Sequence, residues 1–234
     1  HLAYALADRI VFTNARQRDY MLHYTASPEL RSRVHERSVI EPQPMPPGHA
    51  YELVQSSYPL EPGLMNIGYF GAFYAVRGAS DILEGLAGLT AEDRRRLCVH
   101  VFTRDPSEVK AAATRLGVAS NVRSHPYLPY LEFLNLASRM DLLVVADAHT
   151  SGTHGINPYL PSKLSEYLGS GTAIWAIVEP GSTLDEVHEG LKSVLGDRAS
   201  ATAALEEALA RSAAPPPTSS SPRGSERTLP PRFG

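Results

Sequence analysis

The chain has little of several features that mark specialised classes of protein. One of its 234 residues, Cys98, is a cysteine, which excludes an intrachain disulfide framework and fits a reducing compartment. Its apolar runs all fall short of the roughly 20 residues that a transmembrane helix needs. The net charge of −3 argues against nucleic acid binding driven by bulk charge. These absences leave an ordinary globular protein without disulfides, membrane spans or a nucleic acid partner.

The start of the chain also lacks a targeting signal. His1 takes the place of an initiator methionine, and no basic segment followed by an apolar run opens the sequence. We therefore expect a fragment or a processed chain. With 43% hydrophobic and 20% charged residues, this chain can bury a substantial core in one large domain or two small ones.

Strand and helix patterns alternate from about residue 64 to about residue 210. The expected strands are 64–70, 97–102, 121–124, 141–146, 172–178 and 193–195, with helices 78–89, 105–116, 130–139, 162–170, 183–189 and 200–210 between and after them. Such alternation predicts an α/β fold with a parallel sheet covered by helices on both faces. Ligands of such sheets bind at the carboxyl ends of the strands.

The two ends of the chain differ from this pattern. Residues 1–62 contain two expected strands, at 7–14 and 37–41, and then a cluster of four prolines that is typical of an interdomain connection. Residues 212–234 are rich in proline, serine and arginine and nearly free of apolar residues, so we expect a disordered tail.

Residues 161–171 form the most informative segment. Pro161 and Ser162 open an expected helix, Lys163 and Glu166 follow within its first turn, and Gly171 closes it. The N-terminus of a helix attracts anions, and Lys163 adds a full positive charge there. We expect Leu164, Tyr167 and Leu168 to pack against the sheet. The alternative is a solvated Lys163–Glu166 ion pair, worth only about 0.2–0.5 kcal/mol.

Four segments, in this order, resemble the C-terminal half of GT-B glycosyltransferases, specifically the large retaining group that is family 4-like (glycosyltransferase group 1). They are residues 7–14 (ADRIVFTN), 39–42 (VIEP), 66–78 (from NIGYFGAF to Arg77-Gly78) and 161–171 (PSKLSEYLGSG). The resemblance extends over about residues 5–205. It implies a doubly wound, Rossmann-like nucleotide-sugar-binding domain at 63–211, preceded at 1–62 by the end of an acceptor domain and the interdomain connection.

The resemblance also implies a function. The chain would be the donor-binding portion of a retaining glycosyltransferase that moves a sugar from a nucleoside diphosphate sugar to a saccharide or lipid-linked acceptor. It would use neither a metal nor another cofactor. The expected role is surface polysaccharide or glycoconjugate synthesis in the cytoplasm, and the absent N-terminal domain allows peripheral attachment to the inner face of the membrane.

Site residues follow from the positions that match the family motifs. Arg77 would contact the donor diphosphate, and Glu166 would hold the ribose hydroxyls. Ser162 and Lys163 would face the diphosphate from the helix start, while Gly71 and Ala72 form the phosphate loop. Arg77 and Lys163 would be the catalytic pair, because they would stabilise negative charge on the leaving diphosphate.

Two positions depart from the family pattern. Pro158 stands where the motif has a glutamate that contacts the transferred sugar, so we expect Asn157 and backbone amides to hold the sugar instead. Ala72 stands where many members have a second arginine, and Lys163 could supply that charge.

Three alternatives remain at this stage. The chain could be a GT-B-fold nucleotide-sugar epimerase, which would need carboxylates facing the sugar. It could also be a nucleotide-sugar-binding module or an inactive remnant, since Pro158 and the missing acceptor domain weaken the case for transfer. His149 and His154 raise the idea of a metal site, but their spacing and the lack of a third ligand argue against it.

Overall fold

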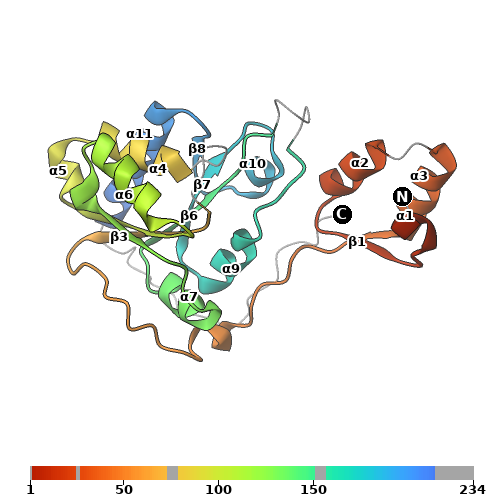
Figure 1. The fold of residues 1–234 in the computed structure, drawn as a ribbon, viewed down its shortest axis with the longest axis horizontal. Helices are drawn as coiled ribbons and strands as arrows, with labels where there is room; N and C mark the ends of the chain where they lie inside the picture. The colour runs from red at the N-terminus through yellow and green to blue at the C-terminus, as the bar shows by residue number, and fades with distance from the viewer. Residues whose placement is uncertain (1, 25–26, 73–78, 151–156, 214–234) are drawn as a thin grey trace, which may run out of the picture.

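The computed structural model describes residues 2–24, 27–72, 79–150 and 157–213, which form two units (Figure 1). The smaller N-terminal unit has a two-stranded parallel sheet, β1 (Ile10–Phe12) and β2 (Ser38–Ile40). The larger unit has a six-stranded sheet in the order β5-β4-β3-β6-β7-β8, and all its strand pairs are parallel. The predicted α/β fold with a doubly wound parallel sheet is confirmed.

The six strands lie close to the expected positions. They are β3 (Met65–Phe70), β4 (Leu97–Phe102), β5 (Val122–His125), β6 (Leu142–Ala146), β7 (Ala173–Val178) and β8 (Leu191–Val194). Every residue of β4 and β6 is buried, as expected for strands covered on both faces. The strand order reverses between β3 and β6, where a doubly wound sheet opens a crevice for ligands.

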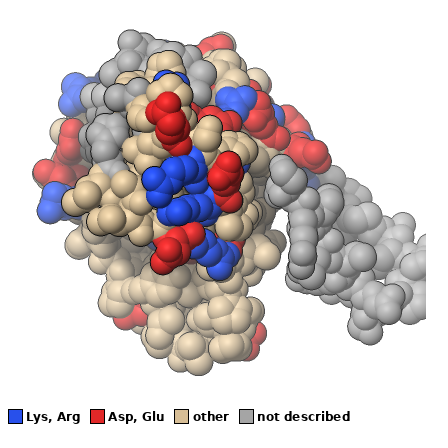
Figure 2. Space-filling model, turned by 90° about the vertical axis from the view of Figure 1, so that its right-hand side faces the viewer, with Lys and Arg blue, Asp and Glu red and all other residues tan. Residues whose placement is uncertain are grey.

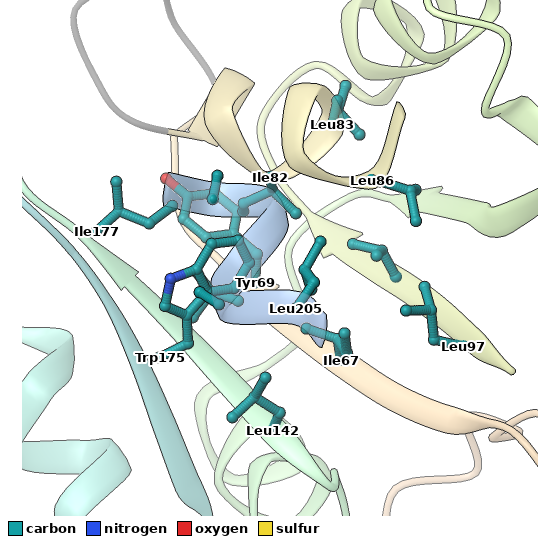
Figure 3. Close-up of a cluster of buried hydrophobic side chains, with 14 of the residues drawn as sticks. Ile67, Tyr69, Ile82, Leu83, Leu86, Leu97, Leu142, Trp175, Ile177 and Leu205 are labelled. Carbon is teal, nitrogen blue, oxygen red and sulfur yellow. The ribbon is translucent and has the colours of Figure 1, made fainter. Parts of the chain in front are cut away.

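Helices cover both faces of this sheet. On one face lie α4 (Ala79–Gly88), α6 (Pro106–Arg115) and α11 (Arg198–Ala213), and on the other lie α7 (Tyr130–Ala137), α9 (Lys163–Ser170) and α10 (Thr183–Val187). Figure 3 shows the core of the first face, where Ile82 and Leu86 of α4 and Leu205 of α11 meet Ile67 and Trp175 of the sheet. A short helix, α5 (Ala91–Arg94), precedes β4.

Helix ends follow the local sequence signals. Asp105 caps α6, because its Oδ1 accepts hydrogen bonds from the backbone N–H groups of Ser107 and Glu108. Gly171 ends α9 with φ = +74°, a left-handed conformation that favours glycine. Both helix ends were predicted from the sequence. Cys98 is buried in β4, and burial raises the pKa of its thiol to about 11.

The N-terminal unit packs three helices around a small core. They are α1 (Leu2–Leu6), α2 (Ala15–His23) and α3 (Pro28–Arg37), and Phe12, Leu22 and Val34 are buried between them and the strands. Basic and acidic side chains lie side by side on the end of the molecule that Figure 2 shows. Within the N-terminal unit, Arg9 and Glu41 form an ion pair.

A proline-rich segment leads from β2 to the larger unit. It ends at the short 3₁₀ helix η1 (Gly48–Tyr51), whose Ala50 and Tyr51 are buried in the same core as α7 and α9. The tail expected at 212–234 lies, apart from its first two residues, outside the described residues. Among the helices of the described residues, none is long and apolar enough to cross a membrane.

Candidate functional site

A cavity of about 320 Å³ opens at the carboxyl ends of β3 and β4. Its walls are Gly71 at the end of β3, Lys163 at the start of α9, Leu128, and five aromatic residues: Phe70, Phe102, Tyr127, Tyr130 and Phe133. The cavity therefore lies at the edge of the sheet where the sequence predicts a ligand. It also brings together two predicted site residues that are 92 positions apart in the chain, Gly71 and Lys163.

The aromatic walls of the cavity are flat and apolar. The rings of Phe70 and Phe102 stack with 4.7 Å between centroids and 5° between planes, and Phe133 meets Phe70 edge-on at 4.8 Å. Tyr127 and Tyr130 are 53% and 52% exposed and leave the cavity open to solvent. Such walls suit a planar ligand group, and the few polar groups beside them can fix its orientation.

Lys163 and Glu166 place opposite charges at this cavity. The Lys163 ammonium lies 2.9 Å from Oε2 of Glu166 and 3.8 Å from the centre of the Phe133 ring. The Glu166 side chain is only 16% exposed, so this pair is more buried than the solvated pair considered above. Burial, reinforced by the neighbouring Glu166 carboxylate, raises the pKa of Tyr130. The ion pair thus forms a partly desolvated charged corner beside an aromatic wall.

Two tyrosines fix helix α9 in this position. The Tyr51 hydroxyl donates a hydrogen bond of 2.5 Å to the carbonyl oxygen of Glu166. A side chain on Gly169 would overlap that hydroxyl, so glycine permits the close approach of η1. The hydroxyl oxygen of Tyr167, which is buried, accepts a 3.3 Å hydrogen bond from the backbone N–H of Phe70. These contacts hold the charged corner against the end of β3.

One expectation for α9 was wrong. Leu164 and Tyr167 are buried as predicted, but Leu168 is 52% exposed. Helix α9 contacts α7, η1 and β6, which cover one side of it and leave Leu168 facing solvent. Ser162 precedes the helix and is exposed, and its side chain makes no capping hydrogen bond.

The start of the predicted phosphate loop is described, and its end is not. Gly71 donates a backbone hydrogen bond of 3.0 Å to the carbonyl of Phe102, and a Cβ there would lie 2.9 Å from the Tyr69 hydroxyl. That hydroxyl donates to the carbonyl of Ala72 at 2.9 Å. Arg77 lies outside the described residues, as does His154. The close packing at Gly71 explains why a glycine stands at this strand end.

Asn157 is buried, and its amide is used within its own loop. Its Nδ2 donates to the carbonyl of Ala148 at 3.1 Å, and its Oδ1 accepts from the backbone N–H of Tyr159 at 3.2 Å. The adjacent Pro158 is also buried. Asn157 thereby ties the segment before α9 to the end of β6.

Sequence reasoning missed a second set of buried polar residues, beside this loop. Oδ2 of Asp147 accepts hydrogen bonds from the Ser182 hydroxyl at 2.6 Å and from the Glu179 backbone N–H at 3.0 Å. Burial raises the pKa of Asp147 to about 6, although these hydrogen bonds oppose the rise. Glu179 in turn accepts from Thr150. An aspartate directly after an apolar strand was the available signal.

His149 adjoins this network. His149 lies 3.9 Å from Glu179, but no group of three histidine, cysteine or acidic residues suited to a metal occurs in the described part of the chain.

The N-terminal unit reaches the same edge of the sheet, which sequence reasoning also missed. Asn14 Nδ2 donates a 3.2 Å hydrogen bond to the carbonyl of Pro158. Arg16, two residues on, binds the carbonyl of Gly181 and the carboxylate of Glu186. These contacts join segments more than 140 positions apart and hold α2 against the loops before α9 and α10.

Comparisons with known proteins identify the fold. No family model matches the chain, and no curated protein matches its sequence. Among solved structures, WaaG, a glycosyltransferase involved in lipopolysaccharide biosynthesis, has a TM-score of 0.63 and 20% identity over 86% of this chain and 53% of WaaG. The lipopolysaccharide outer core galactosyltransferase WaaB has a TM-score of 0.58 and 14% identity over 88% of this chain and 54% of its own.

A third structure, S. aureus TarM in a complex that contains UDP, has a TM-score of 0.57 and 10% identity over 89% of this chain and 37% of TarM. The chain thus spans about half the length of WaaG and WaaB. Identities this low establish the fold and not the activity. The resemblance inferred from the sequence motifs is confirmed at this level: the chain has the fold of one half of a GT-B glycosyltransferase.

Proposed function

We propose that this chain is the donor-binding half of a retaining glycosyltransferase and binds a nucleoside diphosphate sugar in the aromatic cavity. The observation that carries the proposal is the meeting of Gly71 and Lys163 in one cavity, with Glu166 2.9 Å from Lys163. Three residues that the sequence motifs single out for one ligand therefore lie at one edge of the sheet.

Each part of the cavity suits one part of such a donor. The flat aromatic walls take the nucleobase by stacking, and the Glu166 carboxylate accepts hydrogen bonds from the ribose hydroxyls. Lys163, Ser162 and the N-terminus of α9 bind the diphosphate, with Gly71 and Ala72 opposite. The TarM structure, which has a similar fold, contains UDP, the nucleoside diphosphate part of such a donor.

Charge stabilisation is the main chemical task of the site. As the bond between sugar and diphosphate breaks, negative charge grows on the leaving diphosphate, and preorganised positive groups lower the barrier. We assign this role to Lys163, together with Arg77, which precedes α4 in the sequence and lies outside the described residues. Lys163 would exchange its contact with Glu166 for one with phosphate, which leaves Glu166 available to the ribose.

The acceptor and its location extend this proposal. The acceptor is a saccharide or a lipid-linked saccharide, and the reaction takes place in the cytoplasm during synthesis of a surface glycan. This setting is favoured by the structural similarity to WaaG, which is involved in lipopolysaccharide biosynthesis, and to WaaB, a lipopolysaccharide outer core galactosyltransferase.

A second candidate function is nucleotide-sugar binding without transfer. It is favoured by Pro158, which stands at the motif's sugar-side glutamate, and by Asn157, whose amide is already bound within its loop. Epimerisation has less support, because none of the described residues that line the cavity carries a carboxylate.

Calorimetric titration with UDP-, GDP- and dTDP-sugars separates these functions. The proposal requires one of these donors to bind with one-to-one stoichiometry, and NMR to detect slow release of a sugar that retains its anomeric configuration. Binding without any hydrolysis or transfer would favour the binding module. If none of the three donors binds, the proposal of a donor site is refuted. Lys110→Ala, on the exposed side of α6, is the matched control for Lys163→Ala.

A further inference from the structure

Three tyrosines gather where the N-terminal unit meets the loop before α9. Tyr20 of α2 and Tyr24, which caps the C-terminus of this helix, lie edge-on with 5.0 Å between ring centroids, and Tyr159 of the loop meets Tyr20 at 6.4 Å. His23 also lies edge-on to Tyr24, at 5.4 Å. Tyr24 and Tyr159 are 57% and 44% exposed, so two of the three rings present apolar surface to solvent. We call Tyr20, Tyr24 and Tyr159 the tyrosine platform.

The platform continues a row of residues along α2. Arg16 and Tyr20 are four residues apart and lie on one face of α2, and Tyr24 follows at the same spacing as the C-terminal cap residue. Arg16 in the first turn binds the α10 region, and Tyr20 in the second meets Tyr159. Tyr24 extends the row beyond these contacts and stays exposed. The contacts of the earlier turns therefore preorganise the exposed end of the row.

The platform adjoins the proposed donor site. Tyr159 is four residues before Lys163, so their Cα atoms are at most about 14 Å apart. The Asn14–Pro158 hydrogen bond fixes the residue directly before Tyr159 to the first turn of α2. Both units thus contribute to one surface next to the cavity.

The size and chemistry of the platform identify its ligand. With about 150–250 Å² per aromatic side chain, the exposed parts of the platform add up to roughly 250 Å², against about 800 Å² per partner in a stable protein interface. A protein would have to cover charged neighbours as well, such as the exposed Asp19. One face of a pyranose ring presents C–H groups and its rim presents hydroxyls, which match flat aromatic rings that carry phenol groups.

We propose that the tyrosine platform binds a saccharide and is this chain's own part of the acceptor site. The inference rests on the proposed donor function. It adds that some of the residues that recognise the acceptor belong to this chain. The sugar stacks on Tyr24 and Tyr159, with Tyr20 behind them, and hydrogen bonds from the phenols orient it towards the donor cavity.

Saturation-transfer NMR with maltotriose, chitotriose and galactobiose tests this inference. At least one probe should receive saturation from tyrosine ring protons. Tyr24→Ala and Tyr159→Ala should each weaken its binding about five- to tenfold, the range expected for loss of one aromatic contact. Tyr24→Phe and Tyr159→Phe keep the ring and should lose about twofold or less. Leu53→Ala, at an exposed apolar residue distant in sequence, should change nothing.

Two results would overturn the inference: no probe binds, or the Tyr24→Ala/Tyr159→Ala double variant binds a probe as tightly as the wild type. UDP titrations on the same samples report the donor site separately. If the wild type binds UDP but no saccharide, the proposal for the tyrosine platform alone is refuted. If the wild type does not bind UDP, the proposal for the donor site is refuted. Retained UDP binding in the double variant also shows that it is folded.

Discussion

The ammonium of Lys163 lies 2.9 Å from the carboxylate of Glu166, three residues later on α9, at the wall of an aromatic cavity. A phosphate and a ribose would each engage one member of this pair. The side chains of Lys163 and Glu166 are 36% and 16% exposed, so the pair is partly desolvated. Separating these two charges on ligand binding therefore changes the free energy more than separating a fully exposed ion pair would. Substitutions of Lys163 and of Glu166 should therefore affect the binding of different parts of the ligand, the phosphate and the ribose.

Replacing Lys163 by alanine should weaken binding of UDP and leave binding of uridine unchanged. The ammonium is expected to contact the diphosphate, and its loss also leaves the Glu166 carboxylate facing that phosphate. We expect about a tenfold or greater rise in the UDP dissociation constant, measured by calorimetry. The variant should also show a weaker salt dependence of UDP binding. Equal losses for UDP and uridine would place Lys163 elsewhere in the site.

Replacing Glu166 by alanine should abolish discrimination between UDP and its 2′,3′-dideoxy analogue. The wild type should prefer UDP roughly tenfold or more, since hydrogen bonds to a charged group are worth about 1.5–3 kcal/mol. Competition calorimetry measures the ratio directly. Glu206→Gln on the exposed face of α11 is the control. A variant that still discriminates would show that the ribose lies away from Glu166.

Replacing Gly169 by alanine should destabilise the fold through Tyr51. The new methyl group would overlap the Tyr51 hydroxyl, and overpacking of this kind costs about 1–3 kcal/mol. In a Tyr51→Phe background the overlap with the hydroxyl is removed, although the ring carbon Cζ at 3.2 Å and the Pro46 carbonyl at 3.3 Å still crowd the new methyl group. The cost of the alanine should therefore be smaller in this background, since alanine also has the higher helix propensity. Urea unfolding of the four proteins in this double-mutant cycle gives the coupling energy. A cost that is equal in both backgrounds would contradict the contact.

Stability between pH 4 and pH 6 should depend on two buried groups with opposite effects. Burial lowers the pKa of His100 to about 4, so the unfolded state binds more protons below pH 6.5 and stability falls as the pH falls. Burial raises the pKa of Asp147 to about 6, so the folded state keeps a proton that the unfolded state has released, and stability falls as the pH rises. In the wild type the two contributions oppose each other.

Single variants should expose each contribution. Relative to the wild type, the change in the free energy of unfolding from pH 4.5 to pH 5.5 should be more negative in His100→Gln and more positive in Asp147→Asn, each by at most about 1.4 kcal/mol per pH unit. The shifted pKa values of Asp81, His125 and His188 contribute to the pH dependence of all three proteins. Urea unfolding at pH 4.5, 5.5 and 6.5 measures both slopes. Identical pH dependence in the two variants would refute the assigned shifts.

The larger unit could be predicted well because its sequence signals are local. A parallel strand that is covered on both faces is mostly apolar, and β6 and β7 are continuous apolar runs. Helices α6 and α9 begin or end at residues with a clear physical role, Asp105 and Gly171. The motifs that carry the GT-B resemblance are of the same kind, since each is a strand end followed by a loop or helix start.

The rest of the site depends on contacts between distant segments. Tyr51 meets Glu166 across 115 positions, and Asn14 meets Pro158 across 144, so no local pattern could reveal either contact. The apolar stripe of α9 predicted that Leu168 is buried, but its neighbours cover only part of that stripe. Helix α3 was missed although Ser27 and Pro28 are good start signals, because its face carries little hydrophobic periodicity.

The most direct test of the donor site is calorimetric titration of UDP into the wild type and into the Lys163→Ala/Glu166→Ala double variant, with Lys110→Ala/Glu206→Gln as the control. The site predicts one-to-one binding by the wild type and the control, and a loss of at least about 100-fold in the double variant, from two charge-assisted contacts. UDP that binds all three proteins equally, or none of them, would contradict the claim that Lys163 and Glu166 hold a nucleoside diphosphate.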